Sequence, residues 1–216
     1  METIISGFSV LFWSYLIGSI PNGYMMGKFN GLDIRRHGSK NIGATNVRRI
    51  LGRPWGIACF ILDFLKGLIP VMVIGHMIAS NWAIGAGYGG LLAAIGAVLG
   101  HVFPVWLMFR GGKGVATSCA AFILFSPLIG IPASLVGLAV VIATKYLSLG
   151  ALAIPAAFTV GCLIAGNTEA AGLGVFFTVI SLFKNLDHMC QIPSGEAERV
   201  DVIAAIRKKW GKKTEE

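Results

Sequence analysis

Charged side chains are scarce in this sequence. They make up 13% of its 216 residues, whereas hydrophobic residues make up 55%. Soluble domains carry about 25% charged residues, and disordered chains combine high charge with few apolar residues, so the composition excludes both classes. A membrane-spanning helix needs about 20 mostly apolar residues. The chain is therefore long enough to cross a bilayer several times, with little left for an extramembrane domain.

Disulfide and metal-ligand patterns are also missing. The four cysteines form no Cys-x2-Cys pair and no Cys/His spacing typical of a metal site, so we expect neither a disulfide framework nor bound zinc. Each cysteine lies in or beside an apolar run, where a free cysteine behaves as a small hydrophobic residue. No cationic stretch precedes the first apolar run, so a cleaved signal peptide is not predicted and the first helix is expected to stay.

Acidic residues number 10 against 18 basic ones, and the basic residues are clustered. The clusters are Lys28–Arg53, Arg110 with Lys113, Lys145 alone, and Lys184–Lys213. The segments between them carry no Lys or Arg except Lys66, which lies inside an apolar run. This alternation follows the positive-inside rule rather than the pattern of a nucleic-acid-binding protein. We therefore expect the basic segments and the C-terminus in the cytoplasm and the N-terminus outside.

The apolar runs predict an all-α, polytopic integral membrane protein with seven transmembrane segments, some of them short or broken. The expected segments are Ile4–Gly27, Pro54–Ala79, Ile84–Phe103, Val115–Phe125, Leu128–Ala143, Leu149–Ala165 and Ala170–Phe183. The first is interrupted at Gly18–Pro21, and the fourth is about half the length of a span. A five-span interpretation, with the fourth and fifth segments as one re-entrant hairpin, agrees equally well with the charges.

We expect one transmembrane catalytic domain over residues 1–184 and a cytoplasmic tail over residues 185–216. Within the tail, Glu198–Trp210 carries apolar residues at helical spacing beside several cations. That pattern is typical of a helix on an anionic membrane surface, and a solvated helix explains it equally well. We see no internal repeat, which argues against a transporter built from inverted repeats.

The first basic loop combines glycines, small polar residues and cations. Gly38 and Gly43 allow backbone N–H groups to converge on an anion. Side chains that can donate to phosphate oxygens stand between and after them: Ser39, Asn41, Thr45 and Asn46. Thr45 or Asn46 could also cap a following helix, whose positive end favours an anion. The positive-inside rule explains the cations of a cytoplasmic loop, but not the glycines and small polar residues among them. The sequence therefore favours a phosphate site, with Arg49 as its main cation.

A second basic loop, Gly111–Gly114, offers another place for an anion immediately before an apolar helix, with Lys113 as a point charge. It is not a Walker A motif, because the Gly-x4-Gly-Lys-Ser/Thr spacing fails. Asp63 and Lys66 are one helical turn apart, so they can pair and lower the cost of burying charge, either for structure or for function. His101, at the cytoplasmic end of the third span, is either an interfacial hydrogen-bonding residue or a proton acceptor.

The motifs spread over residues 19–117 are Ser19-x-Pro21, Asp33-Ile34-Arg35, Gly38-Ser39-x-Asn41-Ile42-Gly43-Ala44-Thr45-Asn46-Val47-x-Arg49, Asp63-x2-Lys66-Gly67, Gly100-His101-x-Phe103-Pro104-Val105-Trp106-Leu107 and Gly111-Gly112-Lys113-Gly114-Val115-Ala116-Thr117. Together they resemble the bacterial acyl-phosphate:glycerol-3-phosphate acyltransferase family. The resemblance implies a seven-helix enzyme of the bacterial plasma membrane with its site open to the cytoplasm. Such an enzyme transfers a fatty acyl group from acyl phosphate to the 1-position of sn-glycerol 3-phosphate, which gives lysophosphatidic acid and phosphate.

The sequence departs from the family pattern in two places. Lys40 stands where the family usually has glycine, and the third motif, after the last helix, is degraded. The expected catalytic residues are Lys113, His101, Ser39 and Glu196. The expected substrate- or phosphate-binding residues are Ser39, Asn41, Gly43, Thr45, Asn46, Arg49, Gly111, Gly112, Lys113, Gly114, Thr117, Asn185 and His188, of which the last two, like Glu196, are carried over from what remains of the third motif.

Acyl phosphate is already an activated donor, and the sequence lacks the Gly-x-Ser-x-Gly elbow of a serine nucleophile. We therefore expect direct transfer between two bound substrates, by a monomer among membrane lipids, without a covalent intermediate, metal, cofactor or nucleic acid. The alternative is a transporter or channel for an organic phosphate anion, which shares the basic glycine-rich loops and broken helices. Its weakness is that the polar residues gather at one face and not at the midplane. A scaffold without an active site would leave both glycine-rich loops unexplained.

Overall fold

The computed structural model describes residues 1–79, 85–197 and 199–200, and in this part of the chain all regular structure is helical. The chain divides into two compact units, Met1–Gly130 and a second unit that starts at Ile131. The boundary predicted after residue 184 falls inside a helix that continues to Cys190. The amphipathic helix predicted at Glu198–Trp210 lies outside the described residues, except for Arg199 and Val200.

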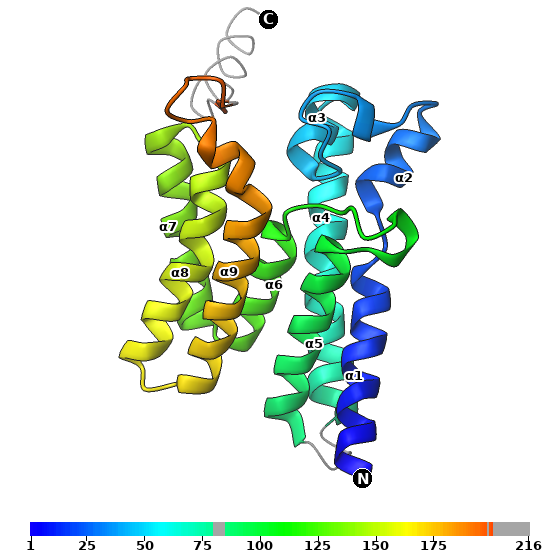
Figure 1. Ribbon diagram of the computed structural model, residues 1–216. Coiled ribbons are helices and arrows are strands. Elements are labelled where there is room, and N and C mark those ends of the chain that lie inside the picture. Colours follow the sequence, from blue (N-terminus) through cyan, green and yellow to red (C-terminus); the bar gives the residue numbers. More distant parts are fainter. Residues whose placement is uncertain (80–84, 198, 201–216) are drawn as a thin grey trace, which may run out of the picture. The chain divides into compact units, whose positions relative to one another are not determined.

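The helices of the first unit follow the predicted spans and loops (Figure 1). They are α1 (Glu2–Gly18), α2 (Asn22–Phe29), α3 (Ala44–Leu51), α4 (Arg53–Ile69), the π-helix η2 (Pro70–Ile78), α5 (Gly85–Val102) and α6 (Val115–Phe125). Two short 3-10 helices, η1 (Ile34–Arg36) and η4 (Val105–Leu107), lie in the connecting loops. Helix α7 (Pro127–Thr144) continues into the second unit, where α8 (Leu147–Ile164) and α9 (Thr168–Cys190) complete the chain of helices.

Within the described residues, six helical stretches are long and apolar enough to cross a membrane. They are Glu2–Phe29, Arg53–His76, Gly87–Leu107, Pro127–Thr144, Leu147–Ile164 and Thr168–Cys190. The remaining predicted segment forms α6, an apolar helix of 11 residues, which is about half the length needed to span a bilayer. The polytopic helical architecture is therefore confirmed, while a seventh crossing stays a prediction.

The first span is broken where the sequence predicts it. Helix α1 ends at Gly18 and α2 begins at Asn22, after Pro21. A backbone carbonyl exposed by such a break needs a partner inside a membrane, because no water is present there. The Nζ atom of Lys66 on α4 supplies one by donating to the carbonyl oxygen of Ile20 at 2.8 Å.

Helices α1 and α5 pack with their backbones close together. A Cβ atom on Gly18 would clash with the carbonyl of Ala97, and one on Gly100 would clash with the carbonyl of Tyr15. Such small-residue contacts are typical of helices packed in membranes. The hydroxyl of Tyr15 also donates to the carbonyl oxygen of Phe103 at 2.8 Å. This bond fixes the C-terminal end of α5, where the second glycine-rich loop begins.

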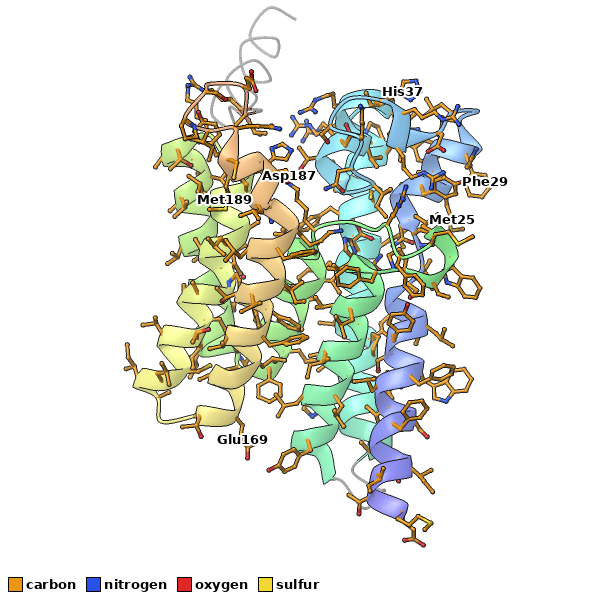
Figure 2. The ribbon with its side chains drawn as sticks, viewed as in Figure 1. Met25, Phe29, His37, Glu169, Asp187 and Met189 are labelled. Atoms are coloured by element: carbon orange, nitrogen blue, oxygen red, sulfur yellow. The ribbon has the colours of Figure 1, made fainter. Side chains whose placement is uncertain are left out.

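The second unit has its own close packing. The side chain of Ser181 on α9 donates to the carbonyl oxygen of Ala151 on α8 at 2.9 Å. A Cβ atom on Gly174 of α9 would clash with the side chain of Thr159 on α8. Glu169 and Asp187 mark the two opposite ends of α9 (Figure 2). The polar residues of the degraded third motif therefore lie at the C-terminal end of this helix or just beyond it.

Candidate active site

The first glycine-rich loop is organised around the side chain of Asn46, which is 1% exposed. Its Nδ2 atom donates to the backbone carbonyls of Asn41 at 2.8 Å and His37 at 3.0 Å. Its Oδ1 atom accepts from the backbone N–H of Ser39 at 3.0 Å. Because both ends of the amide are used inside the loop, we assign Asn46 a positioning role in place of the direct phosphate contact expected from the sequence.

Helix α3 begins at Ala44, with Gly43 as its N-cap residue and no side chain capping it. The prediction that Thr45 or Asn46 caps this helix was therefore wrong, since both lie inside its first turn. The N–H of Gly43 donates instead to Oδ1 of Asn41 at 2.9 Å. The loop thus turns tightly into the helix, and the backbone on either side of Asn41 is held by its neighbours.

Two residues of this loop have a left-handed backbone. Gly38 has a φ of 55° and Lys40 a φ of 58°. A Cβ atom on Gly38 would clash with Oδ1 of Asn46, so glycine is required there for space as well as for conformation. A residue with a side chain, such as Lys40, adopts this conformation at a cost of about 1–2 kcal/mol. The backbone therefore shows why glycine suits position 40, where this chain departs from the family pattern.

Arg35 fixes the approach to the loop. Its guanidinium donates to both carboxylate oxygens of Asp33, at 3.0 and 2.7 Å, and its central carbon lies 4.6 Å from the centre of the Tyr24 ring. These hydrogen bonds and the positive charge of Arg35 favour the ionised carboxylate and lower the pKa of Asp33 below its ordinary value. The contact between Arg35 and Tyr24 connects η1 to α2. His37 lies at the end of the first unit far from the N-terminus (Figure 2).

The second glycine-rich loop lies directly on the end of α5. The N–H of Gly111 donates to the carbonyl of Val102 at 3.2 Å, and that of Gly112 to the carbonyl of His101 at 3.1 Å. A Cβ atom on Gly112 would clash with Nε2 of His101, so the backbone of the loop passes against the imidazole ring. Half-buried Lys113 follows, and the next residue caps α6. The expected arrangement of glycines and lysine immediately before a helix is present.

A buried polar cluster lies behind the second loop, where His101 packs against Gly112. Oδ1 of Asp63 is 3.0 Å from Nζ of Lys66 and 3.0 Å from Nδ2 of Asn22, and 3.8 Å from Nδ1 of His101. The hydroxyl of Thr117 donates to the backbone carbonyl of Asp63 at 2.9 Å. The ion pair predicted from the i, i+3 spacing of Asp63 and Lys66 is thus confirmed. Thr117 is fully buried, so we assign it a positioning role and not the phosphate contact expected from the sequence.

One small hydrophobic core connects the first loop to the segment that leads to the second. The side chains that form it are Met26, Ile34, Ile42, Val47, Cys59 and Leu107. Ile42 belongs to the first glycine-rich loop, and Leu107 lies in η4, on the way to the second. The two loops therefore share one end of the first unit, as a site for two anionic groups requires (Figure 1).

The residues on either side of Leu107 are exposed and apolar. Trp106 is 62% exposed and Met108 82% exposed, and Phe109 is also exposed. Met108 and Phe109 have left-handed φ angles of 51° and 62°. The N–H of Phe109 donates to the carbonyl of Pro104 at 3.0 Å, which holds this turn. The chain therefore presents apolar side chains beside the second glycine-rich loop.

The residues carried over from the third motif belong to the second unit. Asn185 on α9 is fully buried; its Nδ2 donates to the carbonyl of Ser181 at 2.9 Å, and its Oδ1 has no partner among the described residues. His188 is half-buried on the same helix, and Glu196 is exposed beyond its end. Asp187 and Met189, which flank His188, lie at the end of α9 opposite Glu169 (Figure 2).

Sequence reasoning missed Asn22, which donates to the buried carboxylate of Asp63. The available signal was a polar amide at the start of α2, immediately after the break in the first span. In the first loop, the structure brings Ser39, Asn41, Gly43 and Thr45 around Asn46, with the alkyl part of Arg49 beside Gly38.

Comparison with known proteins agrees with this arrangement. A family model described as glycerol-3-phosphate acyltransferase matches residues 8–194. A glycerol-3-phosphate acyltransferase of Rhizobium meliloti (strain 1021) is 39% identical over 196 residues, with 90% of this chain and 93% of the relative covered. One of Thermoanaerobacter sp. (strain X514) is 36% identical over 203 residues, with 94% of each covered.

Two crystal structures of PlsY (YgiH), an integral membrane glycerol 3-phosphate acyltransferase, are also similar. The glycerol 3-phosphate form has a TM-score of 0.82 and 29% identity, covering 93% of this chain and 98% of that one. The lysophosphatidic acid form has a TM-score of 0.79 and 30% identity, covering 90% and 95%. On the matched length, the sequence identity and the similarity of fold, the chain belongs to the glycerol-3-phosphate acyltransferase family.

Proposed function

We propose that this glycerol-3-phosphate acyltransferase uses acyl phosphate as its donor and transfers the acyl group directly to the 1-hydroxyl of sn-glycerol 3-phosphate. The products are lysophosphatidic acid and phosphate, and no covalent enzyme intermediate forms. The observation that carries the proposal is the core that contains both Ile42 of the first loop and Leu107 of η4, the short helix that leads to the second loop. A reaction between two phosphate-bearing molecules needs two neighbouring anion sites.

In this proposal the first loop, Gly38–Asn46, binds one phosphate through backbone N–H groups, Ser39 and Thr45, with Arg49 as its cation. The second loop, Gly111–Gly114, binds the other phosphate, with Lys113 as its cation. Holding both substrates in the reacting orientation lowers the barrier by about 7–11 kcal/mol at best.

The chemical step balances without a cofactor. The hydroxyl oxygen of glycerol 3-phosphate forms a bond to the acyl carbon, and the bond from that carbon to the phosphate oxygen breaks with its electron pair. Backbone N–H groups of the second loop or Lys113 stabilise the negative charge that develops on the carbonyl oxygen. The hydroxyl proton passes to a base and then to the released phosphate. The base is His101 in our proposal, with Glu196 and the substrate phosphate as alternatives.

Purified protein in detergent, given radiolabelled glycerol 3-phosphate and palmitoyl phosphate, tests the proposal. We expect the label to become lipid-soluble, and Lys113→Ala to abolish transfer while the protein stays folded. Lys28→Ala, which removes an exposed cation of the same unit, is the matched control and should stay active. Near-normal turnover of Lys113→Ala would remove Lys113 from the mechanism.

The same assay distinguishes acyl phosphate from acyl-CoA as the donor, and an acyltransferase from a transporter. Palmitoyl phosphate should support transfer and palmitoyl-CoA should not, and the opposite result would overturn the proposed donor. Uptake of labelled glycerol 3-phosphate into vesicles, without conversion, would indicate a transporter. We propose that no metal or cofactor is needed, so transfer should persist after chelation and dialysis.

We further propose that the protein is a monomer in the bacterial plasma membrane, with its glycine-rich loops and C-terminus in the cytoplasm and its N-terminus outside. Such an arrangement requires an odd number of crossings, as the seven-segment prediction has. Cys190, at the end of α9, is exposed. A membrane-impermeant maleimide should therefore label it in inverted vesicles and not in spheroplasts, whereas a variant that combines Glu2→Cys with Cys190→Ser should show the reverse.

A further inference from the structure

The turn that follows α5, which we call the apolar turn, presents apolar side chains on its outside. Its exposed residues are Val105, Trp106, Met108 and Phe109. Between them, Leu107 is buried in the core that it shares with α2. The N–H groups of Leu107 and Phe109 both donate to the carbonyl of Pro104, so the backbone of the turn holds these side chains outward. A cluster of exposed apolar side chains marks a surface that contacts a partner.

Helix α2 extends this surface. Met25 and Phe29 are one helical turn apart and both exposed, and they lie at the outer edge of the first unit (Figure 2). The neighbouring residue Met26 is buried in the same core as Leu107. The inward-facing side chains of α2 and of the apolar turn therefore pack together, while the outward-facing ones form an apolar surface in two parts.

The lengths of two candidate spans relate this surface to a bilayer. The stretch Gly87–Leu107 has 21 residues, which cover about 32 Å as a helix, close to the hydrocarbon thickness of about 30 Å. The stretch Glu2–Phe29 has 28 residues, or about 42 Å, close to the thickness of a bilayer with its headgroups, about 40–45 Å. In a bilayer, these lengths place the apolar turn at the edge of the hydrocarbon and Phe29 among the headgroups.

The residue types suit that level of an anionic membrane. Tryptophan is enriched where hydrocarbon meets headgroups, because its ring is apolar and its N–H is polar. Arg110, which is exposed, follows the apolar turn directly, and a cation at this level is attracted to anionic lipid. Neither α2 nor the apolar turn contains an acidic residue. Apolar side chains bordered by a cation complement a lipid, which has acyl chains below a phosphate.

We propose that the apolar turn and the Met25 and Phe29 side chains of α2 insert into the surface of an anionic phospholipid layer. The apolar side chains lie among the upper parts of the acyl chains, and Arg110 contacts lipid phosphates. Directly after Arg110, the N–H of Gly111 donates to the carbonyl of Val102 on α5. The inserted turn therefore holds the second glycine-rich loop close to the level of the lipid phosphates.

This placement deepens the proposed function, on which only its catalytic consequence rests. An acyl phosphate is an amphiphile, so its acyl chain lies in the hydrocarbon and its phosphate lies at the level of the headgroups. A glycine-rich loop held at that level can bind the phosphate while the acyl chain stays in the membrane. Glycerol 3-phosphate, in contrast, has no apolar chain and reaches the site from water.

Fluorescence quenching in vesicles that contain phosphatidylglycerol tests the insertion without any need for activity. The chain has 5 tryptophans, so the difference between wild type and Trp106→Phe gives the emission of Trp106. We expect phospholipids brominated in the upper acyl chain to quench this emission strongly, and acrylamide in the water to quench it weakly. Strong quenching by acrylamide with none by the brominated lipid would overturn the proposal. Protection from both quenchers would also overturn it, because a second copy of this chain or another protein would then cover the turn.

The role of Arg110 is tested by changing the lipid. In vesicles of phosphatidylcholine alone, quenching of Trp106 by brominated lipid should be weaker, because the anionic partner of Arg110 is missing. Arg110→Gln should remove this difference between the two lipid compositions. A difference of the same size in Arg110→Gln would contradict the assigned contact with lipid phosphates.

Two substitutions at position 108 test the apolar turn itself. Met108→Glu places a carboxylate at the edge of the hydrocarbon, where an ionised side chain is costly, so acrylamide quenching of Trp106 should rise roughly twofold or more. Met108→Leu keeps an apolar side chain, and its quenching should match that of wild type. Unchanged quenching in Met108→Glu, in a protein with the circular dichroism spectrum of wild type, would contradict the insertion.

The catalytic consequence is measured as KM in the phosphatidylglycerol vesicles. Met108→Glu should raise KM for palmitoyl phosphate about tenfold while KM for glycerol 3-phosphate stays within about twofold. An equal rise in both KM values would show that the turn supports the fold of the site and not its level in the membrane. If wild-type protein transfers no acyl group, the proposed function fails and the quenching still decides the insertion. If transfer occurs and Trp106 is exposed to water, only this inference fails.

Discussion

The ammonium group of Lys66 lies 2.8 Å from the carbonyl oxygen of Ile20 and 3.0 Å from the carboxylate of Asp63. One side chain on α4 thus completes a buried ion pair and also satisfies the broken backbone of the first span. The same carboxylate accepts from Asn22, the first residue of α2. A charge placed inside the apolar part of α4 therefore holds the start of the segment that leads to the first glycine-rich loop.

Replacing Lys66 with Met should strongly destabilise the protein. The substitution leaves the buried carboxylate of Asp63 unpaired, which costs about 3–5 kcal/mol when one partner of a buried pair is removed. It also leaves the carbonyl of Ile20 without its donor. Unfolding by a denaturing detergent, followed by circular dichroism, measures the free energy of unfolding. The double variant Asp63→Asn with Lys66→Met should recover part of the loss, and no recovery would show that the carboxylate is not the cause.

Replacing Asn46 with Ala should impair substrate binding more than folding. The change removes the hydrogen-bond partner of the Ser39 N–H and of the Asn41 carbonyl, and each unsatisfied buried group costs about 1–3 kcal/mol. Since the loop is the proposed phosphate site, we expect KM for glycerol 3-phosphate to rise roughly tenfold or more. Asn30→Ala, which removes one side-chain bond to Met26 on α2, is the matched control. Equal KM values for the two variants would contradict the role given to Asn46.

Replacing Lys40 with Gly should stabilise the protein slightly. The change relieves a left-handed conformation of a residue with a side chain, which costs about 1–2 kcal/mol. It also raises the conformational entropy of the unfolded chain, which lowers the free energy of unfolding by about 0.5–1 kcal/mol. The midpoint of thermal unfolding in detergent should therefore rise by a small amount. Lys28→Gly, inside α2, should lower it. A lower midpoint for Lys40→Gly would mean that the lysine side chain makes a compensating contribution.

Replacing Gly112 with Ala should abolish most of the activity, because the added methyl group would displace either the second loop or the ring of His101. Gly172→Ala on α9 is the control, since no atom lies near the position of its added methyl group. Initial rates of acyl transfer measure the effect. Comparable activity in the two variants would show that contact between the loop and the imidazole is unimportant for the reaction.

The helices were predictable because a membrane leaves few other choices for the backbone. The break before Asn22 follows from Gly18 and Pro21, and the start of α6 follows from the glycine-rich loop before it. The π-helical turns of η2 carry no comparable signal. Pro70 indicated only a possible kink, so this stretch was predicted as part of the second span.

The composition of the two loops was predictable from the sequence, but the hydrogen-bond partners of their side chains were not. Glycines and cations indicated two anion sites, whereas the same reasoning made ligands of Asn46 and Thr117. Their positioning roles depend on backbone carbonyls supplied by His37, Asn41 and Asp63. Which carbonyl approaches a given side chain is a property of the tertiary structure, and composition and spacing do not contain it.

At Gly18 and Gly100 the contact between α1 and α5 is made by main chain, because the opposing backbone occupies the space that their side chains would fill. Without side chains there, no change of rotamer can open a crevice along this edge. The two helices are therefore expected to present one closed surface to the surrounding lipid at these positions. We therefore expect a fatty acyl tail to enter or leave this unit at another part of its perimeter, and an inhibitor directed between these helices to find no side chain to contact at the two glycines.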